Sequence, residues 1–224
     1  MTGIVLPQGG PLAGLPEEVK ARVAKTLHPL RFARGAEIIA VEDDSRAFYL
    51  MLEGQAQAVL YSADGKQVTY RDLAPGDIFG ELSALDGEPR SAFVTAQSPV
   101  LAGMLDAPAF EALLAGCAEF GRAISLHLAA QIRAMTQRIF EIQTLLVRDR
   151  LMRELMRRAR ACAGESDRVE IADMPTHYAL ASLIGSHREA VSREMSRLAG
   201  AGLIEKNGRS LVIPSLDNLE RQFS

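Results

Sequence analysis

Cysteine is nearly absent from this chain of 224 residues, which contains only Cys117 and Cys162 and no C-x-x-C spacing. Two cysteines so far apart exclude a disulfide framework, a zinc site built on cysteines and a four-cysteine iron–sulfur cluster. We therefore expect no metal site of these kinds. Both cysteines are expected to be buried as small apolar side chains in a reducing compartment.

The sequence also lacks the segments that direct a chain to or across a membrane. No basic residue precedes Lys20, and the first twenty residues have no sustained apolar core, which argues against a signal peptide. No uninterrupted apolar run approaches the roughly 18–20 residues that a membrane-spanning helix needs. We expect a cytoplasmic protein that has no membrane partner.

Charge is unevenly distributed along the chain. Residues 1–120 contain 9 Lys and Arg against 16 Asp and Glu, a net charge of −7, whereas residues 121–224 contain 16 against 12, a net charge of +4. This asymmetry predicts two modules, of which the second is suited to an anionic partner.

Short apolar runs separated by turn residues occupy residues 30–103, after a helix predicted over residues 15–27. The runs break at Glu53-Gly54, at an Asp64-Gly65 turn and at Pro75-Gly76. Strands of this length, at this turn spacing, predict a sheet sandwich or a barrel.

A long helix is predicted next, and its apolar residues recur at alternating steps of three and four. The opposite face is polar, so the apolar stripe is narrow, as in a seam between two helices, and it predicts a homodimer. The alternative is a core helix packed within its own domain. The expected seam residues are Ile124, Leu128, Ile132, Met135, Ile139, Ile142 and Leu146.

The rest of the chain predicts a helix-turn-helix followed by a hairpin. An Arg-rich helix runs from residue 147 to an end near Gly164, and a short strand or extended segment covers residues 168–175. Two helices then follow over residues 176–185 and 186–202, joined by a turn at Gly185. A tight Asn207-Gly208 turn is predicted to close the hairpin.

The second of these helices has one apolar side and one polar side. Val191, Met195 and Leu198 can dock on the preceding helix, which leaves a polar side to face a major groove. Arg pairs with guanine there, and Glu accepts from cytosine. Alternatively, Ser186 and Glu189 form only a capping box and the arginines are solvated. Residues expected to contact DNA bases or phosphates are Thr176, His187, Arg188, Glu189, Ser192, Arg193, Lys206 and Arg209.

A final motif is the string FGELSALDGEPRSA, Phe79 to Ala92, with Glu81 and Arg90 nine positions apart. A guanidinium suits a phosphate, a carboxylate accepts from a hydroxyl, and Gly80 permits close approach of the backbone. The alternative is a structural ion pair between Glu81 and Arg90.

Over residues 15–213 the order of modules and these two motifs resemble the Crp–Fnr family of bacterial transcription regulators. The stretch from Phe79 to Ala92 is similar to its phosphate-binding cassette. The resemblance implies that Glu81 takes the ribose 2′-hydroxyl of a cyclic nucleotide, and that Arg90 and Ser91 bind its phosphate. It further implies that backbone N–H groups around Gly80, Leu82 and Ser83 close round the sugar-phosphate, and that Met135 and Thr136 meet the purine.

The resemblance implies an α+β fold in three parts. These are a β-roll (jelly-roll-like) cyclic-nucleotide-binding domain over residues 1–117, a dimerisation helix over 118–146 and a winged helix-turn-helix over 147–224. It implies a homodimeric transcription regulator with cyclic AMP, or else cyclic GMP, as allosteric effector. The segment from Arg188 to Arg193 resembles the recognition helix of cyclic-AMP-dependent members, which implies a palindromic TGTGA-like site on double-stranded DNA. RNA polymerase is a further expected partner.

The sequence leaves three other hypotheses open. The first is a regulator of the same fold that responds to no effector or to a different one, such as haem held by His127 or Cys117. A nucleotide-acting enzyme would use Glu81 and Arg90, but the sequence offers no second carboxylate, metal cluster or nucleophile motif, so no catalytic residue is expected. A structural protein would use the long helix alone.

Overall fold

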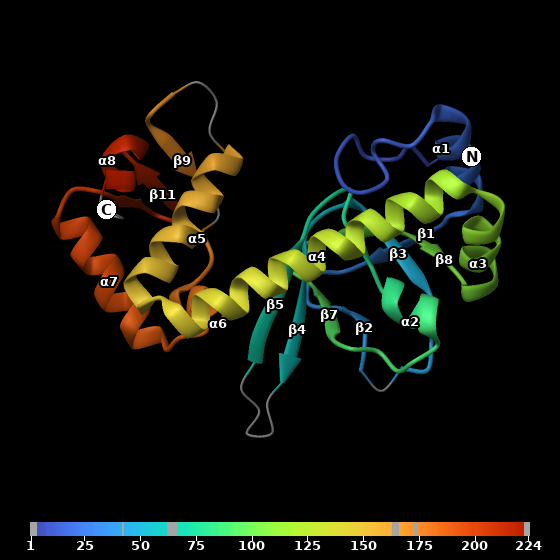
Figure 1. The fold of residues 1–224 in the computed structure, drawn as a ribbon, viewed down its shortest axis with the longest axis horizontal. Helices are drawn as coiled ribbons and strands as arrows, with labels where there is room; N and C mark the ends of the chain where they lie inside the picture. Colours follow the sequence, from blue (N-terminus) through green and yellow to red (C-terminus); the bar gives the residue numbers. More distant parts are fainter. Residues whose placement is uncertain (1–3, 42, 62–66, 163–165, 173, 222–224) are drawn as a thin grey trace. The chain divides into compact units, whose positions relative to one another are not determined.

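The computed structural model of the chain describes residues 4–41, 43–61, 67–162, 166–172 and 174–221. These residues form two compact units, Met1–Arg133 and Ala134–Ser224 (Figure 1). The longest helix, α4 (Ala118–Thr144), contributes its first part to one unit and its last part to the other.

The N-terminal unit is built of two antiparallel sheets and a set of helices. One sheet has the strand order β1-β8-β3-β6 and the other β2-β7-β4-β5. The strands are β1 (His28–Phe32), β2 (Glu37–Ile39), β3 (Phe48–Glu53), β4 (Ala56–Tyr61), β5 (Gln67–Leu73), β6 (Ile78–Phe79), β7 (Phe93–Ala96) and β8 (Val100–Leu105). The helices other than α4 are α1 (Glu17–Thr26), α2 (Glu81–Asp86) and α3 (Ala107–Gly116).

Strand β3 shows why the unit has two apolar layers. Successive side chains of a strand point to opposite faces, and Phe48 to Met51 are all buried. Tyr49 and Met51 pack in the core between the two sheets. Phe48 and Leu50 face the helices instead, where the Phe48 and Phe110 rings stack with centroids 5.0 Å apart. In Figure 1, α1, α3 and the start of α4 lie together beside the strands β1, β8 and β3.

The C-terminal unit packs helices on a small sheet of strand order β10-β11-β9. Its core gathers apolar residues of α5, α6, α7, β9 and β11. Leu151, Leu155 and Ala159 follow one face of α5, and each is fully buried. The elements after α4 are α5 (Val147–Cys162), β9 (Val169–Ile171), α6 (His177–Leu183), α7 (Arg188–Gly200), β10 (Glu205–Asn207), β11 (Ser210–Ile213) and α8 (Leu216–Glu220).

The structure confirms the α+β class, with a β domain, a long helix and a winged helix-turn-helix in the predicted order. None of the helices within the described ranges is long and apolar enough to cross a membrane. The predicted Asp64-Gly65 turn and the predicted helix end at Gly164 lie outside the described residues. The three-part division at residues 117 and 146 stays a prediction.

Four local predictions need correction. Ile124, assigned to the helix seam, is 2% exposed and belongs to the core of the N-terminal unit. Leu146 lies after the end of α4, where its carbonyl accepts from the backbone N–H groups of Asp149 and Arg150. Cys162 is exposed, because it lies beyond the last buried turn of α5. The hairpin pairs Asn207 with Ser210, so its turn is one residue later than expected.

Candidate functional site

The predicted cassette is a tight connection from β6 through α2 to β7. Gly80 precedes α2 in the left-handed region, at a φ of 76°. A Cβ atom here would lie 2.7 Å from both the carbonyl oxygen of Ala47 and Nη1 of Arg90. Gly80 is therefore required on two counts, its backbone conformation and the close approach of its neighbours.

Arg90 is the buried charge of the cassette, with only 4% of its surface exposed. Its Nη1 donates to the carbonyl oxygen of Gly80 at 3.1 Å, and its Nη2 donates to that of Ala47 at 2.9 Å and to the hydroxyl of Ser45 at 3.0 Å. Its Nε is buried and has no hydrogen-bond partner. A buried donor without a partner is costly, which marks Arg90 as a group prepared to meet an acceptor.

Ser45 connects this guanidinium to the carboxylate of Asp43. Ser45 donates from its backbone and its hydroxyl to the two carboxylate oxygens of Asp43, at 2.8 and 2.7 Å. The hydrogen bond from the Ser45 hydroxyl lowers the pKa of Asp43 most, and the bond from the Ser45 backbone lowers it further. The positive charge of Arg90 adds to this effect. Burial lowers the pKa of Arg90, while Tyr49, Asp43 and Glu81 oppose that effect.

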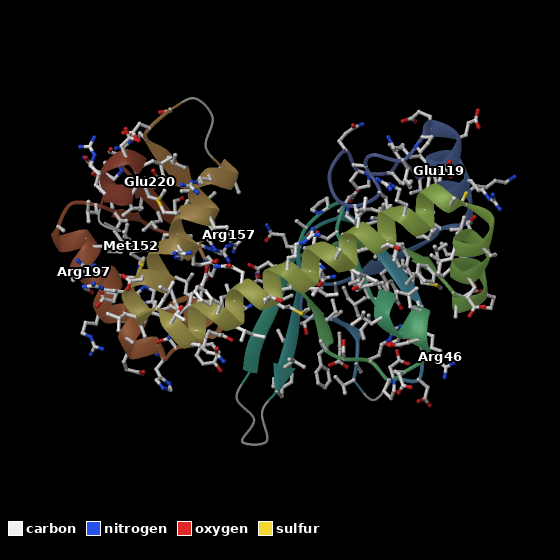
Figure 2. The ribbon with its side chains drawn as sticks, in the orientation of Figure 1. Arg46, Glu119, Met152, Arg157, Arg197 and Glu220 are labelled. Atoms are coloured by element: carbon white, nitrogen blue, oxygen red, sulfur yellow. The ribbon has the colours of Figure 1, made fainter. Side chains whose placement is uncertain are left out.

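Asp43 and Ser45 were absent from the predicted site. The Asp-x-Ser spacing is a local turn signal, but nothing in the sequence connects it with Arg90, 45 residues away. Arg46, the next residue, lies beside α2 in Figure 2, and its Nη1 would be 3.1 Å from a Cβ atom at Gly87.

Glu81 is the second buried charged group of the cassette, at 6% exposure. No ion pair joins Glu81 to Arg90 in the part of the chain that the structure describes, so a structural salt bridge does not explain this motif. Instead, Glu81 Oε1 accepts from Nε2 of Gln131 on α4, at 3.1 Å. The same nitrogen lies 2.7 Å from Nε2 of His127, so one ring nitrogen of this residue, suggested as a haem ligand, is already engaged.

The other predicted cassette residues differ in their surroundings. Phe79 is buried and stacks on Tyr49, with centroids 5.0 Å apart. Ser83 is buried, Leu82 and Ser91 are exposed, and Ala92 is half-buried. Met135 and Thr136 are exposed on the part of α4 that belongs to the C-terminal unit. Their contact with a purine therefore stays a prediction.

These groups together fit a small anion that also carries a hydroxyl. Arg90 offers charge and a buried donor without a partner, and a carboxylate such as Glu81 has acceptor positions beyond the one that Gln131 takes. Within the described ranges, no group of three or more His, Cys, Asp and Glu side chains is arranged to hold a metal ion.

The helix-turn-helix is formed by α6 and α7. Thr176 caps α6, its hydroxyl accepting from the backbone N–H of Ala179 at 3.2 Å. Gly185, at a φ of 63°, turns the chain, and a Cβ atom there would lie 3.0 Å from Cδ1 of Ile142 on α4. The turn thus depends on a glycine for its backbone conformation, and a larger residue would also press on the side chain of Ile142.

Helix α7 has the two faces that its sequence predicts. Val191, Met195 and Leu198 are buried, whereas Arg188, Glu189 and Arg193 are exposed. The helix begins after His187, which makes no side-chain cap bond, so the Ser186–Glu189 capping box, the alternative interpretation of this segment, is not formed. The exposed acidic and basic groups of the first turns remain available to a partner.

His177 is a member of this surface that sequence reasoning missed. Its Nδ1 lies 2.7 Å from the hydroxyl oxygen of Ser192, which joins the start of α6 to the middle of α7. Burial lowers the pKa of His177, and the positive charges of Lys206 and Arg188 lower it further. Side chains from α6, α7 and β10 therefore share one basic region, to which the exposed Arg209 of the hairpin turn adds a further charge.

Comparison with known proteins identifies both parts of the chain. Residues 29–117 match the family of cyclic nucleotide-binding domains, and residues 149–222 match the family of Crp-like helix-turn-helix domains. Each match includes one of the two sites described above.

Whole-chain relatives are transcription regulators. The transcriptional regulator LdrP of Thermus thermophilus is 30% identical over 192 residues, 86% of this chain and 95% of its own. A CRP-like cAMP-activated global transcriptional regulator of Mycobacterium tuberculosis is 26% identical, over 97% of this chain and 98% of its own. The solved structure of a CRP-family transcriptional regulator of T. thermophilus is 29% identical and superposes with a TM-score of 0.69, covering 87% and 96% of the two chains.

Proposed function

Because the chain belongs to the Crp–Fnr family of DNA-binding transcription regulators and carries its cyclic-nucleotide-binding domain, we propose that cyclic AMP is its effector and that it acts as a homodimer. The bound nucleotide would favour the conformation that binds a palindromic TGTGA-like site. RNA polymerase is the proposed further partner of the DNA-bound form.

The observation that carries this proposal is the buried Arg90 with its Nε unpaired, in the same cassette as the buried carboxylate of Glu81. A cyclic phosphate carries one negative charge and supplies oxygen acceptors to a guanidinium. The ribose 2′-hydroxyl supplies the donor that a carboxylate accepts.

Cyclic AMP is placed ahead of cyclic GMP because a cAMP-activated relative aligns along nearly the whole chain. Thr136 would offer a hydroxyl to the purine, and Met135 a thioether. Cyclic GMP remains the alternative, since neither side chain by itself distinguishes the exocyclic groups of adenine from those of guanine.

The proposed dimer surface is the apolar stripe of α4 and the residues next to it. Ile132, Ile139 and Leu146 are 64%, 57% and 63% exposed, and Met135 and Ile142 are 39% and 44% exposed. Large apolar side chains that recur at three and four positions along one helix favour a partner helix. Ile124 is excluded from this surface, because it is buried within its own unit.

The proposed control of DNA binding is a shift between two conformations. A nucleotide shifts this balance only by the difference of its affinities for the two forms. Arg188, Glu189 and Arg193 would contact bases, while Thr176, Lys206 and Arg209 would contact phosphates. We propose that the protein binds and releases the nucleotide without altering it chemically. Recovery of intact nucleotide after incubation with the protein would exclude the enzyme hypothesis.

Calorimetric titration with cyclic AMP and, in parallel, cyclic GMP tests this proposal. The wild-type protein should bind one of them, Arg90→Ala should abolish the heat of binding, and Arg34→Ala should leave it unchanged, because Arg34 is exposed on the loop between β1 and β2. If neither nucleotide binds the wild-type protein, the proposed effector is wrong, and a DNA-binding regulator with another signal remains.

A further inference from the structure

Helix α4 reaches the effector cassette through a pair of polar side chains. The carboxamide of Gln131 lies between Glu81 and His127, its Nε2 being 3.1 Å from Glu81 Oε1 and 2.7 Å from His127 Nε2. His127 and Gln131 are four residues apart and so lie on the same face of α4. The carboxylate and the ring thus share the two hydrogens of a single amide nitrogen.

This arrangement defines the hydrogen-bond direction at each contact. The amide nitrogen only donates, so His127 Nε2 must accept and the ring hydrogen must be on Nδ1. Burial lowers the pKa of His127 to about 4, the positive charge of Arg71 lowers it too, and Asp77 opposes them. The imidazole is therefore neutral at neutral pH, and it keeps the lone pair that the amide needs.

The carboxylate that receives the other hydrogen is held at one point and open at others. Glu81 is the first residue of the six-residue helix α2 and is 6% exposed. An ionised carboxylate has about four acceptor positions, of which Gln131 takes one. Since the amide is neutral, it orients Glu81 without cancelling its charge, which leaves a strong acceptor for a second donor.

We propose that Gln131 and His127 are positioning residues for Glu81, holding its carboxylate where it accepts the ribose 2′-hydroxyl, so that they determine how well the site distinguishes a ribonucleotide from its 2′-deoxy form. This inference rests on the proposed function, because it requires a cyclic nucleotide in the cassette. Gln131 supplies the hydrogen bond to Glu81, and His127 keeps the amide turned so that its nitrogen faces the carboxylate. Replacing His127 removes one of the contacts that hold the amide in that orientation.

The specific consequence is a change in selectivity and not only in affinity. Contacts of Arg90 with the phosphate are the same for cyclic AMP and 2′-deoxy cyclic AMP, so both ligands report equally on a loosened or damaged cassette. Only the ribonucleotide has the hydroxyl that Glu81 would accept. The ratio of the two dissociation constants therefore isolates the positioning of Glu81.

The test is a calorimetric titration of the full-length protein with both nucleotides. Wild type should bind cyclic AMP about tenfold more tightly than its 2′-deoxy form, the range expected for one hydrogen bond to a charged group. Gln131→Leu should weaken cyclic AMP binding about tenfold and the 2′-deoxy ligand at most about twofold. His127→Phe should reduce the ratio by a smaller factor in the same direction.

Gln137→Leu is the matched control, because Gln137 also lies on α4 and donates to a glutamate, Glu141, at 2.9 Å on the exposed surface. It should leave the ratio unchanged. In a Glu81→Ala background, Gln131→Leu should change neither constant further, since the residue it positions is gone.

The outcomes separate this inference from the function beneath it. If the wild type discriminates against the 2′-deoxy ligand and Gln131→Leu discriminates equally well, the positioning role is wrong while the effector stands. If Gln131→Leu weakens both ligands by the same factor, the amide has a structural role only, and the inference also fails. If the wild-type protein binds neither nucleotide, the proposed function fails first.

Discussion

His177 Nδ1 and Ser192 Oγ lie 2.7 Å apart, and this contact joins the first residue of α6 to α7. Lys206 and Arg188 are near enough to the imidazole to lower its pKa together with burial. The pKa of the ring is therefore below that of a free imidazole, and the ring is mainly neutral at neutral pH. His177 is thus an orienting group of the proposed DNA surface, whereas Lys206 is a charged one.

Salt dependence should separate these two roles. Each Lys or Arg that neutralises a phosphate contributes about 0.9 to the slope of log affinity against log salt. At neutral pH, Lys206→Ala should reduce that slope by about one, whereas His177→Gln should weaken binding without changing it. Fluorescence anisotropy with a palindromic TGTGA duplex measures both. A slope that falls equally in the two variants would show that His177 carries charge.

Arg193→Ala should weaken binding to the same duplex by about 1–3 kcal/mol and relax the preference at one base pair. The reason is that Arg193 is exposed in the second turn of α7, on the face that is proposed to meet the base edges. Arg197, labelled in Figure 2, is the control on the same helix. It lies in the last turn and pairs with Glu194 at 2.8 Å. Equal losses in both variants would argue for a general electrostatic effect.

Gly80→Ala should destabilise the N-terminal unit by about 1–3 kcal/mol and abolish nucleotide binding. A side chain at a φ of 76° is strained, and this one would meet Ala47 and Arg90 at 2.7 Å. Gly14→Ala is the control in the same unit, where a Cβ atom would meet nothing within 4 Å. Denaturant unfolding compares the two. A Gly80→Ala protein as stable as Gly14→Ala would contradict the observed cassette.

Ile139→Lys should dissociate the proposed dimer, because it places a charge in the apolar stripe of α4. Phe140→Lys should not, although Phe140 is 56% exposed and Ile139 57%, because Phe140 points about 100° away round the helix. Sedimentation equilibrium gives the mass of each variant. If both variants are dimers, or both are monomers, the apolar stripe of α4 does not determine the dimer contact.

His127 should make folding stability fall in acid. Its folded-state pKa is about 4 against 6.5 without burial, so between these values the unfolded chain binds more protons. The contribution of the neutral ring to the free energy of unfolding is complete above pH 6.5 and is lost as the pH falls from 6.5 towards 4. The loss is about 2 kcal/mol once solvent screening of a half-buried ring is included. Unfolding curves of wild type and His127→Gln should therefore converge in acid. Parallel pH profiles would contradict this.

The sequence predicted what depends on neighbours along the chain. Glu81 begins a short helix and Arg90 follows the turn after it, so one contiguous string of residues contains both charges and the glycine, Gly80, that precedes them. The buried and exposed faces of α7 follow from a period of 3.6 residues. Such local rules need no knowledge of the tertiary fold.

The partners of those residues could not be predicted in the same way. Ser45 reaches Arg90 across 45 residues, and Gln131 reaches Glu81 across 50. Both contacts exist only after the sheets and α4 have packed. Ile124 illustrates a second limit, because a helix uses the same apolar spacing to cover its own core and to meet another helix. Only the surrounding structure separates the two.

The unpaired Nε of Arg90 has a consequence for the amount of protein that a cell retains. A buried donor without an acceptor reduces stability by about 1–3 kcal/mol, and a ligand that satisfies it adds its own binding free energy to the folded form. Proteases degrade the unfolded fraction. A fall in the concentration of the proposed nucleotide would then shorten the lifetime of the regulator as well as weaken its proposed DNA binding, so that degradation would act in the same direction as the signal.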